Sequence, residues 1–220
     1  MKTLVEGFTK QLQEALDIAN AATLTKKNNV HNIVITGLGG SGISGTILSE
    51  LVSLECPVPI IANKDYFLPD FVNENSLVII SSYSVNTEET TSAMQQAIAK
   101  KAQIVCVTSG GKVQEIAKQH NLDIILIPGG NPPRSCIGYS LVQLFKIMQF
   151  NGFVKTDLMA QVQSTIALLD AEKTAIKAEA TTIAKTLLHK IPVIYSLGTC
   201  EGIAVRFRQQ INENSKMLCW

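Results

Sequence analysis

The chain has 220 residues, of which 46% are apolar and 17% charged, and its formal net charge is +1. This composition supports a substantial core in one large domain, or in one domain and part of another, and argues against disorder. A net charge near zero without a basic cluster argues against nucleic-acid binding, and no apolar run reaches the ~18 residues of a membrane span.

The cysteines and histidines restrict the chemistry further. The five cysteines are scattered without a Cys-x-x-Cys pair, and the three histidines lie far apart in the sequence. We therefore expect free thiols in a reducing compartment, and we expect no metal site. The first residues lack the apolar core of a signal peptide, so the expected location is the cytoplasm.

Short apolar runs alternate with helical stretches over the first two thirds of the chain. After a helix predicted over 8–24, strands are predicted at 32–36, 58–62, 77–80, 103–108 and 123–128. Helices are predicted between and after them, from Gly42 to about Leu54 and over 87–101, 112–120 and 136–150. This alternation is typical of right-handed crossovers, so the predicted fold class is α/β, a doubly wound, five-stranded parallel sheet with helices on both faces.

The pattern changes after residue 151. Residues 152–190 form a predicted helical linker, and a strand over 191–199 with a helix over 201–217 then repeats the strand-and-turn pattern of 32–42. One strand cannot bury itself, so 191–220 must pack on something else, or the chain is a fragment of a longer protein. We expect a first domain in 1–151 and the first β-α unit of an incomplete second domain in 191–220. Candidate core positions in the linker are Leu158, Val162, Ile166, Leu169, Ile176, Ile183, Leu187 and Leu188.

Three hydroxyl side chains follow the third predicted strand, where the next helix starts. They are Ser82, Ser84 and Thr87. Helix starts carry free N–H groups and partial positive charge, so this cluster suits the oxygens of a phosphate monoester. The alternative is that Ser84, Asn86 or Thr87 only caps the helix.

A glycine-rich turn follows the first predicted strand. Gly37-x-Gly39-x-x-Gly42 fits the dinucleotide spacing, but that reading also needs an acid at the end of the second strand, where Asn63 and Lys64 stand. A phosphate alone needs only the backbone at Gly39 and Gly40 and the hydroxyl of Ser41. In a parallel sheet the first and third strand ends can be neighbours, so Ser41 could converge on the same anion as Ser84. The glycines could also serve only a tight turn.

Two charged residues occur later in the chain. Arg134 follows the fifth strand on a loop rich in glycine and proline, where its guanidinium could bind a sugar phosphate or simply face solvent. Glu213 lies late in the last predicted helix and, by local sequence alone, is a surface glutamate.

The chain as a whole resembles the sugar isomerase (SIS) domain family and, more narrowly, its bifunctional phosphoglucose/phosphomannose isomerases. The matching segments are 39–42, 82–90, 128–130 with Arg134, and 210–216. The resemblance implies that Gly40, Ser41, Ser82, Ser84 and Thr87 bind the substrate phosphate. It also implies that Arg134 acts beside C1 and C2 of the sugar, and that Glu213 shuttles a proton between these carbons through a cis-enediol(ate). No metal or organic cofactor is required.

The resemblance has two departures and leaves alternatives open. Val85 stands where many relatives have glycine, and the chain stops at Trp220, before a histidine that assists ring opening in the family. We therefore expect a part of such an enzyme, inactive or weakly active, that binds hexose 6-phosphate and forms a homodimer. The competing hypotheses are a non-catalytic phosphosugar-binding module and a nicotinamide-dinucleotide-binding domain.

Overall fold

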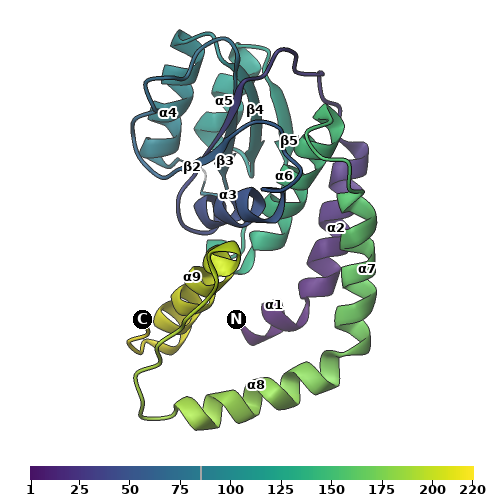
Figure 1. The fold of residues 1–220 in the computed structure, drawn as a ribbon, viewed down its shortest axis with the longest axis vertical. Helices are drawn as coiled ribbons and strands as arrows, with labels where there is room; N and C mark the ends of the chain where they lie inside the picture. Colours follow the sequence, from purple (N-terminus) through teal and green to yellow (C-terminus); the bar gives the residue numbers. More distant parts are fainter. Residues whose placement is uncertain (85) are drawn as a thin grey trace.

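A parallel sheet forms the centre of the part of the molecule that precedes α7 (Leu158–Ala171). The computed structural model describes residues 1–84 and 86–220 (Figure 1). Within these residues, five parallel strands lie in the order β2-β1-β3-β4-β5. The predicted fold class, an α/β protein with a five-stranded parallel sheet, is thereby confirmed. The strands are β1 (Asn32–Thr36), β2 (Ile60–Asn63), β3 (Ser76–Ser82), β4 (Gln103–Thr108) and β5 (Asp123–Leu126).

Helices cover both faces of the sheet because alternate residues of a strand point to opposite sides. Ile79 and its alternate neighbours pack into a core with α2 (Phe8–Ala21), α3 (Gly39–Leu51) and α6 (Ile137–Asn151). Ile80 and its neighbours pack into a second core with α4 (Glu88–Ala99) and α5 (Gly111–Gln119). The central strand β3 is buried along its whole length, as expected for a parallel sheet with two covered faces.

Several predicted boundaries shift by a few residues. The first predicted helix ends at Ala21 rather than residue 24, and the short α1 (Lys2–Glu6) precedes it. β2 begins at Ile60, because Pro59 has no N–H with which to continue the ladder, and β5 ends at Leu126, two residues before Pro128.

The C-terminal part of the chain is an extended arm, defined here as residues 158–220 (Figure 1). It contains α7 (Leu158–Ala171), α8 (Lys173–Leu187), the 3₁₀ turn η2 (Gly198–Cys200), α9 (Glu201–Gln210) and the π-helical turn η3 (Ile211–Ser215). The predicted core positions Leu158, Val162 and Ile166 are confirmed. Ile176, Ile183 and Leu188 are exposed, so their predicted core role is wrong: no described residue of α8 is buried.

The strand predicted over 191–199 is also wrong, because no strand is assigned there among the described residues. The segment makes backbone hydrogen bonds to the end of the chain: Ile194 N donates to Trp220 O at 2.6 Å, and Trp220 N donates to Pro192 O at 2.9 Å. A β-branched run without a neighbouring sheet has no ladder to join. The division at 151 and 190 into two domains stays a prediction.

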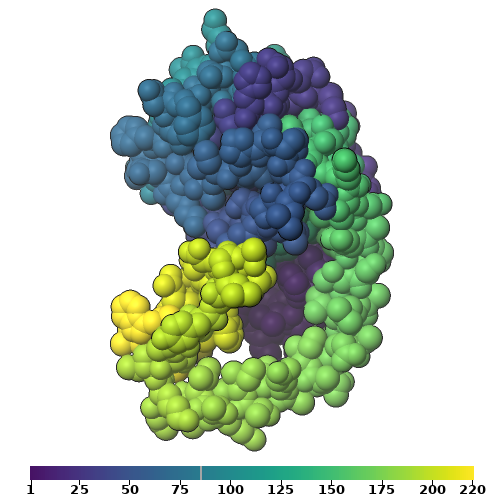
Figure 2. Space-filling view, in the orientation of Figure 1, coloured from purple at the N-terminus to yellow at the C-terminus, as the bar shows by residue number. Residues whose placement is uncertain are grey.

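A hollow of about 730 Å³ lies between the arm and the N-terminal helices. Leu4, Val5 and Ile176 are among its lining residues, and Lys177 Nζ pairs with Glu6 Oε1 at 2.7 Å beside it. Figure 2 shows the arm curving around this space rather than packing against the sheet domain along its whole length. In the part of the chain that the structure describes, no helix is long and apolar enough to cross a membrane.

Candidate functional site

The carboxyl ends of β1 and β3 meet at the point where the strand order reverses. β1 lies between β2 and β3, so the chain winds to one side after β1 and to the other after β3. The turns that follow the two strands touch: Tyr83 N donates to Ser41 Oγ at 3.2 Å in a buried hydrogen bond. The prediction that the first and third strand ends are neighbours is confirmed. Such switch points are the usual ligand sites of open α/β sheets.

The glycine turn exposes backbone N–H groups at the start of α3. Gly39 has a φ of +53°, which favours glycine, and a Cβ on Gly40 would lie 3.1 Å from Pro133 O. The preceding Leu38 makes no side-chain cap, so the first N–H groups of α3 stay available. This arrangement suits an anion. β2 ends at Asn63, so the ribose-binding acid of a dinucleotide site is not at that position.

The three hydroxyls after β3 differ in their hydrogen bonds and in their exposure. Ser82 Oγ donates to Ser84 O at 2.7 Å, and Thr87 Oγ1 donates to the same carbonyl at 3.2 Å. Thr87 occupies the N-cap position of α4 but makes no side-chain cap bond there. These two hydroxyls therefore order the loop, and their oxygens remain able to accept. The Ser84 residue is exposed, so its hydroxyl can reach a ligand. Val85, which stands where many relatives have glycine, lies outside the described residues.

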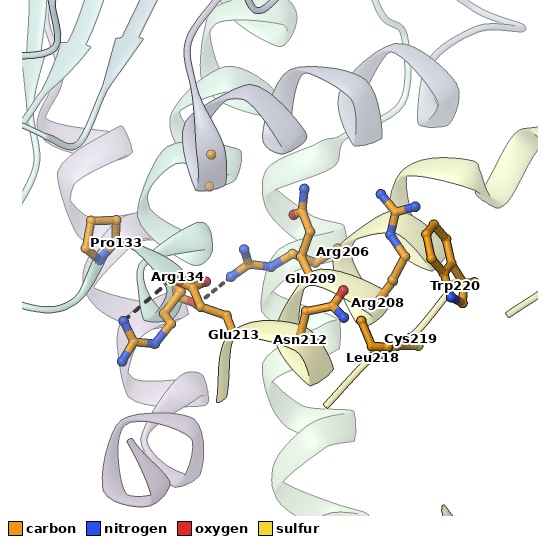
Figure 3. Close-up of a pocket in the computed structure, with 12 residues that line it drawn as sticks. Pro133, Arg134, Arg206, Arg208, Gln209, Asn212, Glu213, Leu218, Cys219 and Trp220 are labelled. Atoms are coloured by element: carbon orange, nitrogen blue, oxygen red, sulfur yellow. Dashed lines mark hydrogen bonds and ion pairs between the residues drawn. The ribbon is translucent and has the colours of Figure 1, made fainter. Parts of the chain in front are cut away.

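Arg134 and Glu213, 79 positions apart by their residue numbers, face each other across two turns (Figure 3). Arg134 stands on the 3₁₀ turn η1 (Pro133–Ser135), and Glu213 stands on η3, not on the regular helix that was predicted there. Arg134 Nη1 lies 3.7 Å from Glu213 Oε1, while Arg134 Nε donates to Asn214 Oδ1 at 2.9 Å. At 3.7 Å the ion pair is too long for a hydrogen bond, and the Glu213 side chain is 48% exposed. The carboxylate can therefore engage a ligand.

One cavity of about 640 Å³ joins the glycine turn to this ion pair. The predicted residues Gly40, Arg134 and Glu213 line it together, and Figure 3 shows the last two of them. Ser41, which directly follows Gly40, is not among the lining residues of the cavity, and neither are Ser82, Ser84 and Thr87. The structure therefore brings the predicted residues together as two linked groups, and their individual roles stay predictions. The remaining lining residues are Gly39, Pro133, Arg206, Arg208, Gln209, Asn212, Leu218, Cys219 and Trp220.

Arg206 is a site residue that the sequence interpretation missed. Its guanidinium donates to the Arg134 carbonyl oxygen. Burial lowers the pKa of Arg206, and the nearby Glu213 carboxylate opposes that shift. Arg206 thus connects α9 to the turn that carries Arg134. Its only sequence signal is the seven-residue spacing to Glu213, two helical turns along the same face.

The arm reaches the site because α9 docks on α3. Gly202 N donates to both carboxylate oxygens of Glu50, at 2.8 Å and 3.0 Å, which places negative charge at the start of α9. The approach is close: a Cβ on Gly202 would lie 3.0 Å from Ile47 Cγ1. The same helix α3 therefore offers its N-terminus to the cavity and holds the helix that leads to Glu213.

No group of three or more His, Cys, Asp or Glu side chains that could hold a metal ion occurs among residues 1–84 and 86–220. The described cysteines are free, and burial raises the pKa of Cys106 to about 12, so that thiol stays protonated at neutral pH.

Comparison with known proteins adds four findings. A family model described as the bacterial phospho-glucose isomerase C-terminal SIS domain matches residues 176–220. The bifunctional phosphoglucose/phosphomannose isomerase of Caldicellulosiruptor bescii is 41% identical over 225 residues, covering 96% of this chain and 65% of the relative. The enzyme of the same name from Thermoplasma acidophilum is 36% identical over 215 residues, covering 97% of this chain and 65% of the relative. The C-terminal domain of glucosamine-fructose-6-phosphate aminotransferase from Francisella tularensis has a similar fold, with a TM-score of 0.76 at 13% identity, covering 98% of this chain and 68% of that one.

The chain thus spans 65% of the length of these two curated relatives. The sequence likeness extends over nearly the whole chain, while the likeness to the solved structure concerns the fold alone.

Proposed function

Because the chain belongs to the sugar isomerase (SIS) domain family, we propose that it is part of an aldose–ketose isomerase acting on hexose 6-phosphates. The reaction is the interconversion of glucose 6-phosphate, and also mannose 6-phosphate, with fructose 6-phosphate. Residues 191–220 then form the start of a second SIS domain, in agreement with the family model that matches 176–220.

The phosphate binds at the switch point between β1 and β3. The available N–H groups of Gly39 and Gly40 and the hydroxyls of Ser41 and Ser84 are donors for its oxygens. Ser41 Oγ accepts from Tyr83 N, which leaves the hydroxyl proton free to donate to the ligand. Ser82 and Thr87 act by holding the Ser84 carbonyl, and so the shape of the loop.

Glu213 moves the proton between the two carbons. It removes the proton from C2 of the open-chain aldose, and the electron pair moves into the C1–C2 bond while O1 takes the charge of an enediolate. Return of the proton to C1, with a proton shift from O2 to O1, gives the ketose. Arg134 and Arg206 stabilise the negative charge on the enediolate oxygens.

The single observation that carries the proposal is the Arg134–Glu213 pair, 3.7 Å apart, in a cavity that also receives the N-terminus of α3. A base, a cation and an anion-binding turn around one space are the parts that a phosphosugar isomerase needs. A purely structural pair would gain little from a half-exposed position.

The test is hydrogen exchange on the substrate, because it reports proton abstraction even where overall turnover is slow. The chain is incubated with fructose 6-phosphate in D₂O, and deuterium at C1 is followed by NMR. We expect incorporation with the unsubstituted chain and a loss of about 10³-fold or more in the Glu213→Gln variant, since the amide cannot act as the base.

The matched control is Glu179→Gln on the exposed helix α8, which removes the same charge away from the cavity and should leave the exchange rate unchanged. Binding of fructose 6-phosphate without any exchange would favour a non-catalytic phosphosugar-binding module. Exchange that survives in Glu213→Gln would show that the assigned base is wrong.

A further inference from the structure

Tyr83, in the turn after β3, makes hydrogen bonds to the turns that follow β1, β4 and β5. It lies between Ser82 and Ser84, yet it is only 7% exposed. The backbone N–H of Tyr83 donates to the Oγ of Ser41, which lies in the turn after β1, at 3.2 Å. Its backbone carbonyl accepts from Ser109 Oγ at 2.7 Å, after β4, and its phenol oxygen accepts from Asn131 N at 3.1 Å, after β5.

The bond to Asn131 connects the two halves of the proposed site. Asn131 lies on the loop that leads from β5 to Arg134, and Pro132 and Pro133, which follow it, stiffen that loop. The backbone of Tyr83 lies in the turn that holds the proposed phosphate ligands. One residue therefore contacts both the turn after β1 and the loop that leads to Arg134.

We propose that Tyr83 is a positioning residue that holds the Arg134 loop at a fixed distance from the phosphate turn, so that a hexose 6-phosphate can contact both at once. This inference rests on the proposed function. It concerns sugar phosphates specifically, because inorganic phosphate occupies only the turn and does not need the second contact.

The contact is stable across neutral pH. Burial, together with a hydrogen bond to the Cys136 thiol, raises the pKa of Tyr83 to about 12. The phenol therefore stays protonated and keeps a lone pair for Asn131 N. Phenylalanine would preserve the packing but leave the Asn131 N–H without its acceptor.

The experiment compares two ligands in one variant. Dissociation constants for fructose 6-phosphate and for inorganic phosphate are measured by NMR titration with the unsubstituted chain and with Tyr83→Phe. We expect the affinity for fructose 6-phosphate to fall about tenfold, while that for inorganic phosphate changes less than about twofold, since the bond from Tyr83 N to Ser41 is kept.

The matched control is Tyr139→Phe. Tyr139 is 5% exposed, belongs to the same core, and donates its hydroxyl at 2.5 Å to Glu14 Oε2 on α2, and not to any of the turns that Tyr83 joins. Its loss should leave both affinities unchanged. Ser109→Ala, which removes the donor to the Tyr83 carbonyl, gives a second variant with an expected loss of about threefold for fructose 6-phosphate alone.

Equal weakening of both ligands in Tyr83→Phe, or no weakening of either, would overturn the positioning role. The proposed function fails in a different way: the unsubstituted chain would then bind inorganic phosphate but not fructose 6-phosphate. Arg134→Gln is the reference variant, because it removes the second contact directly. In a double-mutant cycle, the losses of Tyr83→Phe and Arg134→Gln should be less than additive, because both act on one contact.

Discussion

The sheet domain and the arm differ in how much of their apolar surface is buried. In the sheet domain, β1 and β3 are buried on both faces, and two cores hold the helices in place. In the arm, α8 has no buried residue among those described, and Tyr195 and Leu197 are 90% and 79% exposed. The sheet domain therefore has a core of its own, while the arm depends on the few places where it touches that domain.

These few contacts matter because the proposed site is divided between the two regions. The phosphate turn and Arg134 belong to the sheet domain, and Glu213 belongs to the arm. The arm is anchored by α7 against α2 and by α9 against α3 (Figure 1). Stability should thus be a property of the sheet domain, and the geometry of Glu213 a property of the α9 contact.

The largest expected effect is a loss of stability confined to the sheet domain. Ile79→Ala empties a fully buried position in β3 and should lower the free energy of unfolding by about 2–5 kcal/mol. Ile183→Ala removes the same atoms from α8, where the side chain is 42% exposed, and should change it by less than about 0.5 kcal/mol. Urea unfolding of both variants measures the difference. Similar losses would mean that the arm has a buried core of its own.

A smaller effect is expected at the contact between α9 and α3. Gly202→Ala places a methyl group 3.0 Å from Ile47 Cγ1 and should weaken this docking by about 1–3 kcal/mol, as overpacking does. Hydrogen exchange of the α9 amides should then become faster, while the amides of β3 stay protected. Gly198→Ala is the matched control, because no atom lies within 4 Å of its added Cβ. Unchanged protection of α9 in Gly202→Ala would show that this contact does not hold the arm.

The smallest effect concerns the junction where the arm leaves the sheet domain. Glu55 accepts hydrogen bonds from Lys155 N and Thr156 N, at 3.1 Å each, and from the Thr156 hydroxyl. The hydrogen bond from the Thr156 hydroxyl is the largest cause that lowers the pKa of Glu55 below its usual 4.5, and the hydrogen bonds from the backbone N–H groups lower it further. A carboxyl group whose pKa is lower in the folded chain than in the unfolded chain stabilises the fold at pH values above its unfolded pKa. That stabilisation is lost as the pH falls through its folded pKa.

Glu55→Gln should therefore lower the Tm slightly at pH 7, and the difference from the unsubstituted chain should shrink as the pH falls below 4.5. Thermal unfolding at several pH values measures it. A difference that persists unchanged at low pH would contradict the assigned charge dependence.

The sequence was informative where structure depends on local pattern. The β-branched runs predicted the strands, and parallel topology predicted that the turns carrying Ser41 and Ser84 meet. Local pattern failed in the arm, where an apolar run at 191–199 and the stripe with Ile176 and Ile183 lack a partner surface. The contact between Gly202 and Glu50 joins positions 152 residues apart, so no local sequence pattern predicts it. Family resemblance, and not the local sequence, singled out Glu213.

The central claim is that a phosphosugar bridges the two regions, with its phosphate on the sheet domain and its reacting carbons at the arm. A crystal structure with bound fructose 6-phosphate tests this most directly. We expect the phosphate oxygens to lie within hydrogen-bonding distance of Gly40 N and Ser41 Oγ, with C1 and C2 about 3–3.5 Å from the Glu213 carboxylate. A phosphate bound instead between Arg206 and Arg208, with the glycine turn empty, would contradict the account.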